Sequence, residues 1–197
     1  MRTFLLIMLT GMLFTNASGQ TSFSPIDSKL SIIKDNNLTT LVCSGSALSV
    51  KFQLKHEVTV LPKNNFVTID GHAIQITPLK FSGYKNNITD QNPGNQRLLL
   101  DTYSKYELAY FKNDLGIQLI NASNQWVMIK SKGWFIWYFK VGNVPARVDK
   151  QVSIQLFAST IVGDNILTIN APALNDDDFG KAGLIVNDMM ETLTITK

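Results

Sequence analysis

Two histidines, His56 and His72, are the residues whose type and spacing most directly suggest metal chemistry in this 197-residue chain. They lie on alternating apolar segments on either side of Pro62. If these segments pair through a turn at Pro62, the two imidazoles approach each other with Asp70 or Glu57 beside them, and such nitrogen and carboxylate ligands suit Zn²⁺. The alternative is that each histidine ends a buried strand face and packs there half-exposed. We therefore expect no bound metal, with His56 and His72 as the candidates should one bind.

An acidic run, Asp176-Asp177-Asp178, suggests a calcium site at first sight. An EF-hand loop needs alternating oxygen ligands and a Glu at its twelfth position, and this stretch lacks both. Acidic residues at the start of a helix satisfy free N–H groups and complement the helix dipole. The run therefore predicts a helix N-terminus.

The single cysteine, Cys43, is followed by Ser44-Gly45-Ser46, which lacks the Gly-x-Ser-x-Gly order of a nucleophile elbow. A cysteine nucleophile needs a histidine base, and only His56 or His72 could serve. Phosphate-binding Gly-x-x-x-x-Gly-Lys and dinucleotide Gly-x-Gly-x-x-Gly motifs are missing from the sequence. We predict no catalytic residue and no cofactor, and a hydrolase with an unrecognised site stays an alternative.

Residues 133–140, GWFIWYFK, form the most apolar aromatic stretch of the chain. With a period of two, Trp134, Ile136 and Tyr138 point to one face, and Phe135, Trp137 and Phe139 point to the other. A strand that is apolar on both faces needs cover on both, so the stretch predicts a central strand. Trp134, beside the preceding turn, and Trp126 are the candidates for an exposed aromatic platform that binds carbohydrate or peptide.

The elements that would position these residues follow from periodicity and turn chemistry. Thirteen residues alternate from Leu48 to Val60, which predicts a long strand that bends or breaks midway. Asp70-Gly71 predicts a tight hairpin in which Ile69 pairs with His72. Residues 79–96 are polar and rich in Gly, Pro and Asn, and they predict a long loop.

A helix is expected over residues 97–115, with Leu99, Tyr103, Tyr106 and Tyr110 on its buried stripe and Gly116 as its cap. Glu107 stands at the edge of that stripe and is expected to reach water. Strands are predicted at 117–120, 125–130 and 134–140, then a hairpin around residues 162–165, and a second helix opening at Asn175-Asp176. This order indicates an α+β fold, an antiparallel sheet flanked by helices.

The N-terminus carries one positive charge, an apolar block over residues 4–14 and small residues before Gln20, which is the layout of a secretory signal peptide. The block is shorter than the roughly 20 residues of a membrane span. We expect cleavage after residue 19, an N-terminal segment at 20–47 with one strand, a single domain at 48–197 and no transmembrane segment after cleavage. The formal charge of +3 is spread over single lysines rather than a patch, which argues against nucleic-acid binding.

The C-terminal third resembles PsbP-like domains. The likeness rests on a hairpin over residues 152–171, a break at Pro172, Phe179 near the start of the final helix, and the closing Met189-Met190-Glu191-Thr192-Leu193. The resemblance covers about residues 97–195 and implies an α-β-α sandwich around an antiparallel sheet, with accessory or binding roles. The Tyr-rich helix and the Trp-rich strands are also similar to secreted proteins of unknown function from Bacteroidetes.

Taken together, these patterns predict a secreted, periplasmic or extracellular, non-catalytic accessory or binding protein. Its partner would be a protein or a glycan of unknown identity. Two alternatives stay open: a carbohydrate- or peptide-binding module that uses exposed aromatics, and the hydrolase mentioned above.

Overall fold

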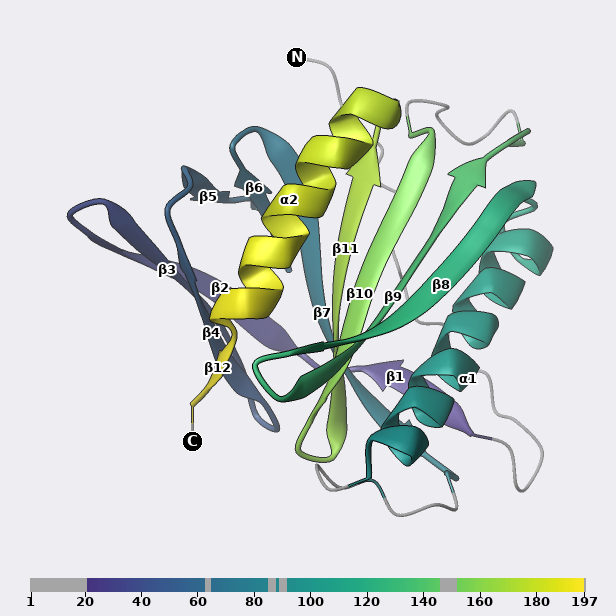
Figure 1. The fold of residues 1–197 in the computed structure, drawn as a ribbon, viewed down its shortest axis with the longest axis horizontal. Coiled ribbons are helices and arrows are strands. Elements are labelled where there is room, and N and C mark those ends of the chain that lie inside the picture. Colours follow the sequence, from purple (N-terminus) through teal and green to yellow (C-terminus); the bar gives the residue numbers. More distant parts are fainter. Residues whose placement is uncertain (1–20, 63–64, 85–87, 89–91, 146–151, 197) are drawn as a thin grey trace.

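The computed structural model of the chain describes residues 21–62, 65–84, 88, 92–145 and 152–196. The signal peptide expected over residues 1–19 lies outside this part. The described residues form an α+β fold that is mostly antiparallel sheet with two helices, as the sequence predicted (Figure 1).

The larger sheet has eight strands, all paired antiparallel. Seven follow the order β5-β6-β7-β11-β10-β9-β8, and β1 pairs with the far end of β7. The strands are β1 (Ser22–Pro25), β5 (Val58–Val60), β6 (Phe66–Ile69), β7 (His72–Ser82), β8 (Leu119–Ile129), β9 (Lys132–Val141), β10 (Ile154–Val162) and β11 (Asn165–Ala173).

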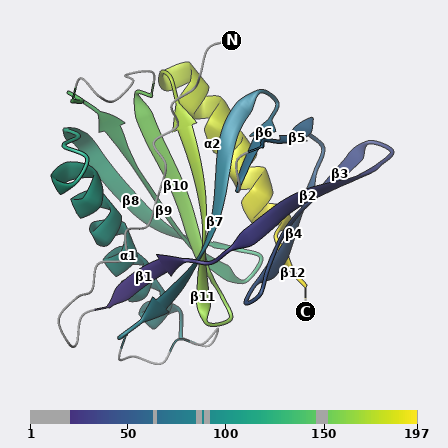
Figure 2. The same ribbon diagram turned by 180° about the vertical axis from the view of Figure 1, so that it is seen from behind.

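The smaller sheet has four strands in the order β12-β4-β3-β2. They are β2 (Ser28–Asp35), β3 (Leu38–Gly45), β4 (Ser49–Leu54) and β12 (Thr194–Ile195). This sheet lies beside α2 (Asp176–Thr192), which crosses the larger sheet over β11 and β10 (Figures 1 and 2).

The two described helices pack on opposite faces of the larger sheet. The central strands show this, since neighbouring residues in them enter different cores. Trp134 of β9 and Leu156 of β10 belong to the core that contains α2 and the smaller sheet. Phe135 and Phe157, one residue further along, belong to the core that contains α1 (Pro93–Asn113). The apolar stretch at residues 133–140 is therefore covered on both faces in β9, as its composition predicted, although Ile136 and Tyr138 on the α2 face are only partly buried.

Local turn chemistry explains the hairpins. Asp70 and Gly71 both have positive φ, at 47° and 82°, and Ile69 pairs with His72 as expected. Gly163 has φ of 57° and opens the turn between β10 and β11. Asn175 caps α2, since its side chain accepts a hydrogen bond from the Asp178 backbone N–H at 2.9 Å.

The first helix begins earlier than predicted. Asn92 caps it by accepting from the Asn95 N–H at 3.1 Å, and Pro93 takes the first helical position, where its missing N–H has no consequence. At the other end the cap is Asp114 rather than the expected Gly116, which lies two residues further on with φ of 68° and lets the Ile117 N–H bond back to the Phe111 carbonyl.

Several strand predictions were wrong. Residues 20–47 contain three strands, β1, β2 and β3, rather than one, and β3 pairs directly with β4 across the boundary expected at residue 48. The break expected within the strand at 48–60 is confirmed and falls at 55–57, but the sequence did not predict that the two parts enter different sheets.

Two further boundaries also differ. The strands expected at 117–120 and 125–130 are one strand, β8, interrupted by a bulge where Asn121 has φ of 51°. The polar segment 79–96 begins as strand, since β7 runs to Ser82; part of the expected loop lies outside the described residues.

Candidate functional site

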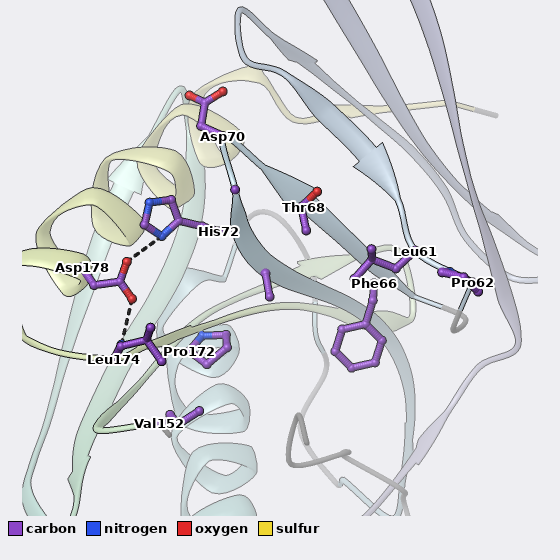
Figure 3. A pocket seen from close by; sticks show the side chains of 12 residues that line it. Leu61, Pro62, Phe66, Thr68, Asp70, His72, Val152, Pro172, Leu174 and Asp178 are labelled. Atoms are coloured by element: carbon purple, nitrogen blue, oxygen red, sulfur yellow. Dashed lines mark hydrogen bonds and ion pairs between the residues drawn. The ribbon is translucent and has the colours of Figure 1, made fainter. Parts of the chain in front are cut away.

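A pocket with a volume of about 720 Å³ opens beside the β6–β7 hairpin and the start of α2 (Figure 3). Its wall is mainly apolar, and four polar side chains, Thr68, Asp70, His72 and Asp178, lie among the apolar ones. The apolar lining consists of Leu61, Pro62, Phe66, Ala73, Val152, Pro172 and Leu174, with Gly71 at the turn. This size and composition are typical of small-molecule sites.

His56 links the hairpin to α2 through two carboxylates. Its Nδ1 lies 2.6 Å from Asp70 Oδ2, and its Nε2 lies 2.9 Å from Asp188 Oδ2. A carboxylate only accepts hydrogen bonds, so both ring nitrogens donate together only in the protonated imidazolium. Burial by itself would lower the pKa of His56, but the hydrogen bonds to Asp188 and Asp70 outweigh it, and the net effect raises that pKa.

Asp70 is the point where this link meets the pocket. Its Oδ2 pairs with His56, and its Oδ1 accepts from the Glu57 backbone N–H at 2.8 Å. The bond to His56 lowers the pKa of Asp70, so the carboxyl is ionised at neutral pH. Asp70, which the sequence predicted as a turn residue, thus also places a fixed negative charge on the pocket wall.

His72 makes a second link between the hairpin and α2. Its Nδ1 donates to Asp178 Oδ1 at 2.9 Å, and Asp178 Oδ2 accepts from the Leu174 backbone N–H at 2.7 Å (Figure 3). Asp178 therefore holds the first turn of α2 against the hairpin. The acidic run lies at the start of a helix, as the sequence predicted, but Asn175 rather than an aspartate caps that helix.

The described residues do not supply a set of ligands for a metal ion at His56 and His72. The structure brings Asp70 to His56, as the hypothesis required, but each imidazole is paired with a carboxylate of α2. Within the described ranges, no group of three or more His, Cys, Asp or Glu side chains is placed to hold a metal ion. The sequence did not predict that Asp178 and Asp188 are the partners of the two histidines. For Asp188 one indication was available, because it lies between the buried Val186 and Met189 on the helix.

The prediction of an exposed Trp134 was wrong. Its side chain is 0% exposed and lies in the core beneath α2, because the preceding turn is at Lys130-Ser131 and leaves Trp134 inside the paired strand. Trp126 is half-buried, and its indole lies over Gly133, where any side chain would collide with it. The two tryptophans therefore do not form an exposed platform.

Cys43 is fully buried in the core of the smaller sheet and α2. Burial raises the pKa of its thiol, which is opposite to the activation that a nucleophile needs. Both histidines that could have served as its base are paired with carboxylates instead.

The prediction that Glu107 reaches water was also wrong. Its side chain is 4% exposed, on the α1 face of the larger sheet, and burial raises its pKa to about 8, while the neighbouring Tyr103 hydroxyl acts in the other direction. The sheet beneath α1 carries further buried polar groups, among them the Ser159–Thr168 hydroxyl pair at 3.0 Å and the Asn170–Gln155 amide pair at 2.9 Å.

Comparison with known proteins adds a distant likeness of fold. No family model and no curated protein matches the chain. The solution structure of cyanobacterial PsbP (CyanoP) from Synechocystis sp. PCC 6803 is similar over 95% of this chain and 99% of that chain, with 11% identity and a TM-score of 0.40. This is the family that the C-terminal third resembles, and so distant a likeness says nothing about activity.

One result bears on membranes. Neither helix of the described part combines the length and the apolar character that crossing a bilayer requires.

Proposed function

We propose that this chain is an exported, non-catalytic binding protein that holds the apolar part of a small ligand in the pocket beside the β6–β7 hairpin. The observation that carries the proposal is the pocket itself, about 720 Å³ with a mainly apolar wall. Exposed apolar surface that is hollowed and rimmed by a few polar groups marks ligand sites, because burying a ligand there removes apolar area from water.

Binding rather than catalysis is favoured by the groups that line the pocket. The lining residues in the described part of the chain include no Ser and no Cys, His72 pairs with Asp178, and Asp70 pairs with His56. The proposal extends to architecture: helices on opposite faces of the larger sheet support an α-β-α sandwich of the PsbP type. Export rests on the N-terminal pattern and is checked by finding Gln20 as the first residue of the secreted protein.

To test this proposal, a larger side chain is introduced that fills part of the pocket. Ala73 lines it from β7 and is half-buried, so Ala73→Phe places a ring inside the space. We expect the uncharged dye Nile red to bind the wild type and to bind this variant at least about tenfold more weakly, because a ring's worth of apolar contact is lost. Fluorescence titration measures both dissociation constants.

The matched control is Ala122→Phe, the same substitution at an exposed position of β8. It should bind Nile red like the wild type. Equal binding by both variants would place the dye elsewhere, and a wild type that binds no dye would remove the basis of the proposal. Circular dichroism of each variant shows that the sheet is intact.

A separate prediction concerns the His56 link. The pKa of His56 is raised in the folded state. The stabilisation that the link contributes is therefore fully present below about pH 6.5, the unfolded-state pKa, and is lost as pH rises through the higher folded-state pKa. Because the pKa of Asp70 is lowered in the folded state, the contribution of Asp70 to stability is lost at acid pH, where the carboxylate protonates. The link should therefore stabilise most around pH 5–6.

A double-mutant cycle with His56→Gln and Asp188→Asn measures this coupling by urea unfolding. We expect about 0.5–1 kcal/mol at pH 6 and less at pH 9, a modest value because the Asp188 side chain is 50% exposed. A coupling of the same size at both pH values would contradict the prediction.

A further inference from the structure

The rim of the pocket carries negative charge, and within the described residues no Lys or Arg of the lining balances it. Asp70 and Asp178 both line the pocket, and none of the lining residues in the described part of the chain is Lys or Arg. The chain as a whole has a formal charge of +3, so this negative rim is a local feature and does not reflect the overall composition.

The histidines reduce this charge but cannot remove it. The two links comprise three carboxylates, Asp70, Asp178 and Asp188, and two imidazoles, His56 and His72. Even with both imidazoles protonated, one carboxylate charge stays unbalanced within the group.

The carboxylates are also held in place. Each oxygen of Asp70 and of Asp178 already accepts one hydrogen bond, from His56, His72 or a backbone N–H of Glu57 or Leu174. A carboxylate oxygen has two lone pairs, so each retains capacity for a further donor. Fixed acceptors beside an apolar wall favour a ligand that brings a charged donor and disfavour one that brings a second anion.

We propose that the ligand of this pocket is a small organic cation, an ammonium or guanidinium group on an apolar body. The inference rests on the proposed function of the pocket. The cationic group lies at the acidic rim, near Asp178 with Asp70 further out at the tip of the hairpin, and the apolar body lies against Phe66, Val152 and Pro172 (Figure 3). Carboxylic acids and sulfonates are disfavoured by the same charge, since their anionic group would meet carboxylates, and the described lining residues offer no lysine or arginine to receive it.

The test uses three probes that share one body and differ in charge: 4-phenylbutylamine, 4-phenylbutanol and 4-phenylbutyrate. Titration followed by amide chemical shifts of Gly71 and Ala73 gives the three dissociation constants. We expect the amine to bind at least about tenfold more tightly than the carboxylate, with the alcohol between them, because attraction and repulsion at a partly exposed rim each change the affinity by up to about fivefold. Added NaCl should narrow the difference.

Charge-removing variants show whether the rim causes the preference. Asp70→Asn keeps the turn, since Asn-Gly is a preferred pair for two residues of positive φ, and Asp178→Asn is the second variant. Each should reduce the amine-to-carboxylate ratio by about threefold or more, with little change for the alcohol. Should one variant unfold, the other still decides.

The outcomes separate this inference from the proposed function. Equal affinity for all three probes would overturn the cation preference and leave the pocket as a neutral apolar site. An amine preference that persists in both Asn variants would overturn the assignment to the rim. Failure of all three probes to shift the pocket amides, together with failure of Nile red to bind, would overturn the proposed function itself.

Discussion

Replacement of Trp134 by alanine should destabilise the protein by about 3–5 kcal/mol, the range for a fully buried tryptophan. The side chain is 0% exposed and lies in the core between the larger sheet, α2 and the smaller sheet. Its indole nitrogen has no hydrogen-bond partner among the described residues, so its contribution is packing and burial. Urea unfolding followed by far-UV circular dichroism measures the loss.

Two matched variants make the result specific. Trp134→Phe keeps a large ring and removes the unpartnered N–H, so it should cost much less than the alanine change, about 1 kcal/mol. Trp126→Ala, at a half-buried position on β8, should also cost less. If Trp134→Ala left the unfolding midpoint unchanged while abolishing binding of a sugar or peptide, the tryptophan would be a surface platform after all.

The parts of the fold that were predictable from sequence are those set by neighbouring residues. Asp70-Gly71 fixes its hairpin because both turn residues need positive φ, and Asn175 starts α2 because its side chain satisfies a free N–H. The two-faced burial of residues 133–140 also follows from their own pattern. Each of these features is decided within a few residues of the chain.

The features that were missed depend on distant partners. Alternation runs unbroken from residue 48 to 60, yet β4 and β5 join different sheets, because their partners β3 and β6 lie elsewhere in the chain. The pocket is assembled from segments around residues 61–62, 66–73, 152 and 172–178, and the His56–Asp188 link spans 132 residues. No local pattern encodes such contacts.

The phase of α1 shows the same limit within one helix. Tyrosines at 103, 106 and 110 suggested one stripe, but the buried residues include Leu99, Tyr103, Glu107 and Phe111, each four apart. Phe111 packs on Phe139 and Phe157 of the sheet, and this contact rotates the helix so that Glu107 is carried inward. Periodicity predicted the helix, but the rotation of the helix about its own axis depends on the surface against which it packs.

Replacement of Glu107 by glutamine should stabilise the protein increasingly as pH rises from about 5 to 8. Burial raises the pKa of Glu107 to about 8, and no ion pair within the described ranges involves it. An unfolded glutamate loses its proton near pH 4.3, so between these two values only the folded state holds the proton. The free energy of unfolding therefore falls by up to about 1.4 kcal/mol per pH unit over this range, a loss that glutamine does not share.

The measurement is urea unfolding of the wild type and Glu107→Gln at pH 5, 6.5 and 8. The two proteins should differ least at pH 5, where the glutamate is neutral in the folded state, and the variant should be more stable by a few kcal/mol at pH 8. Glu191→Gln, the same change at an exposed position of α2, reports the effect of removing one surface charge. A difference between wild type and Glu107→Gln that stays constant across the three pH values would mean that the carboxyl is ionised inside the fold, and a cation or water would then have to reach it beneath α1.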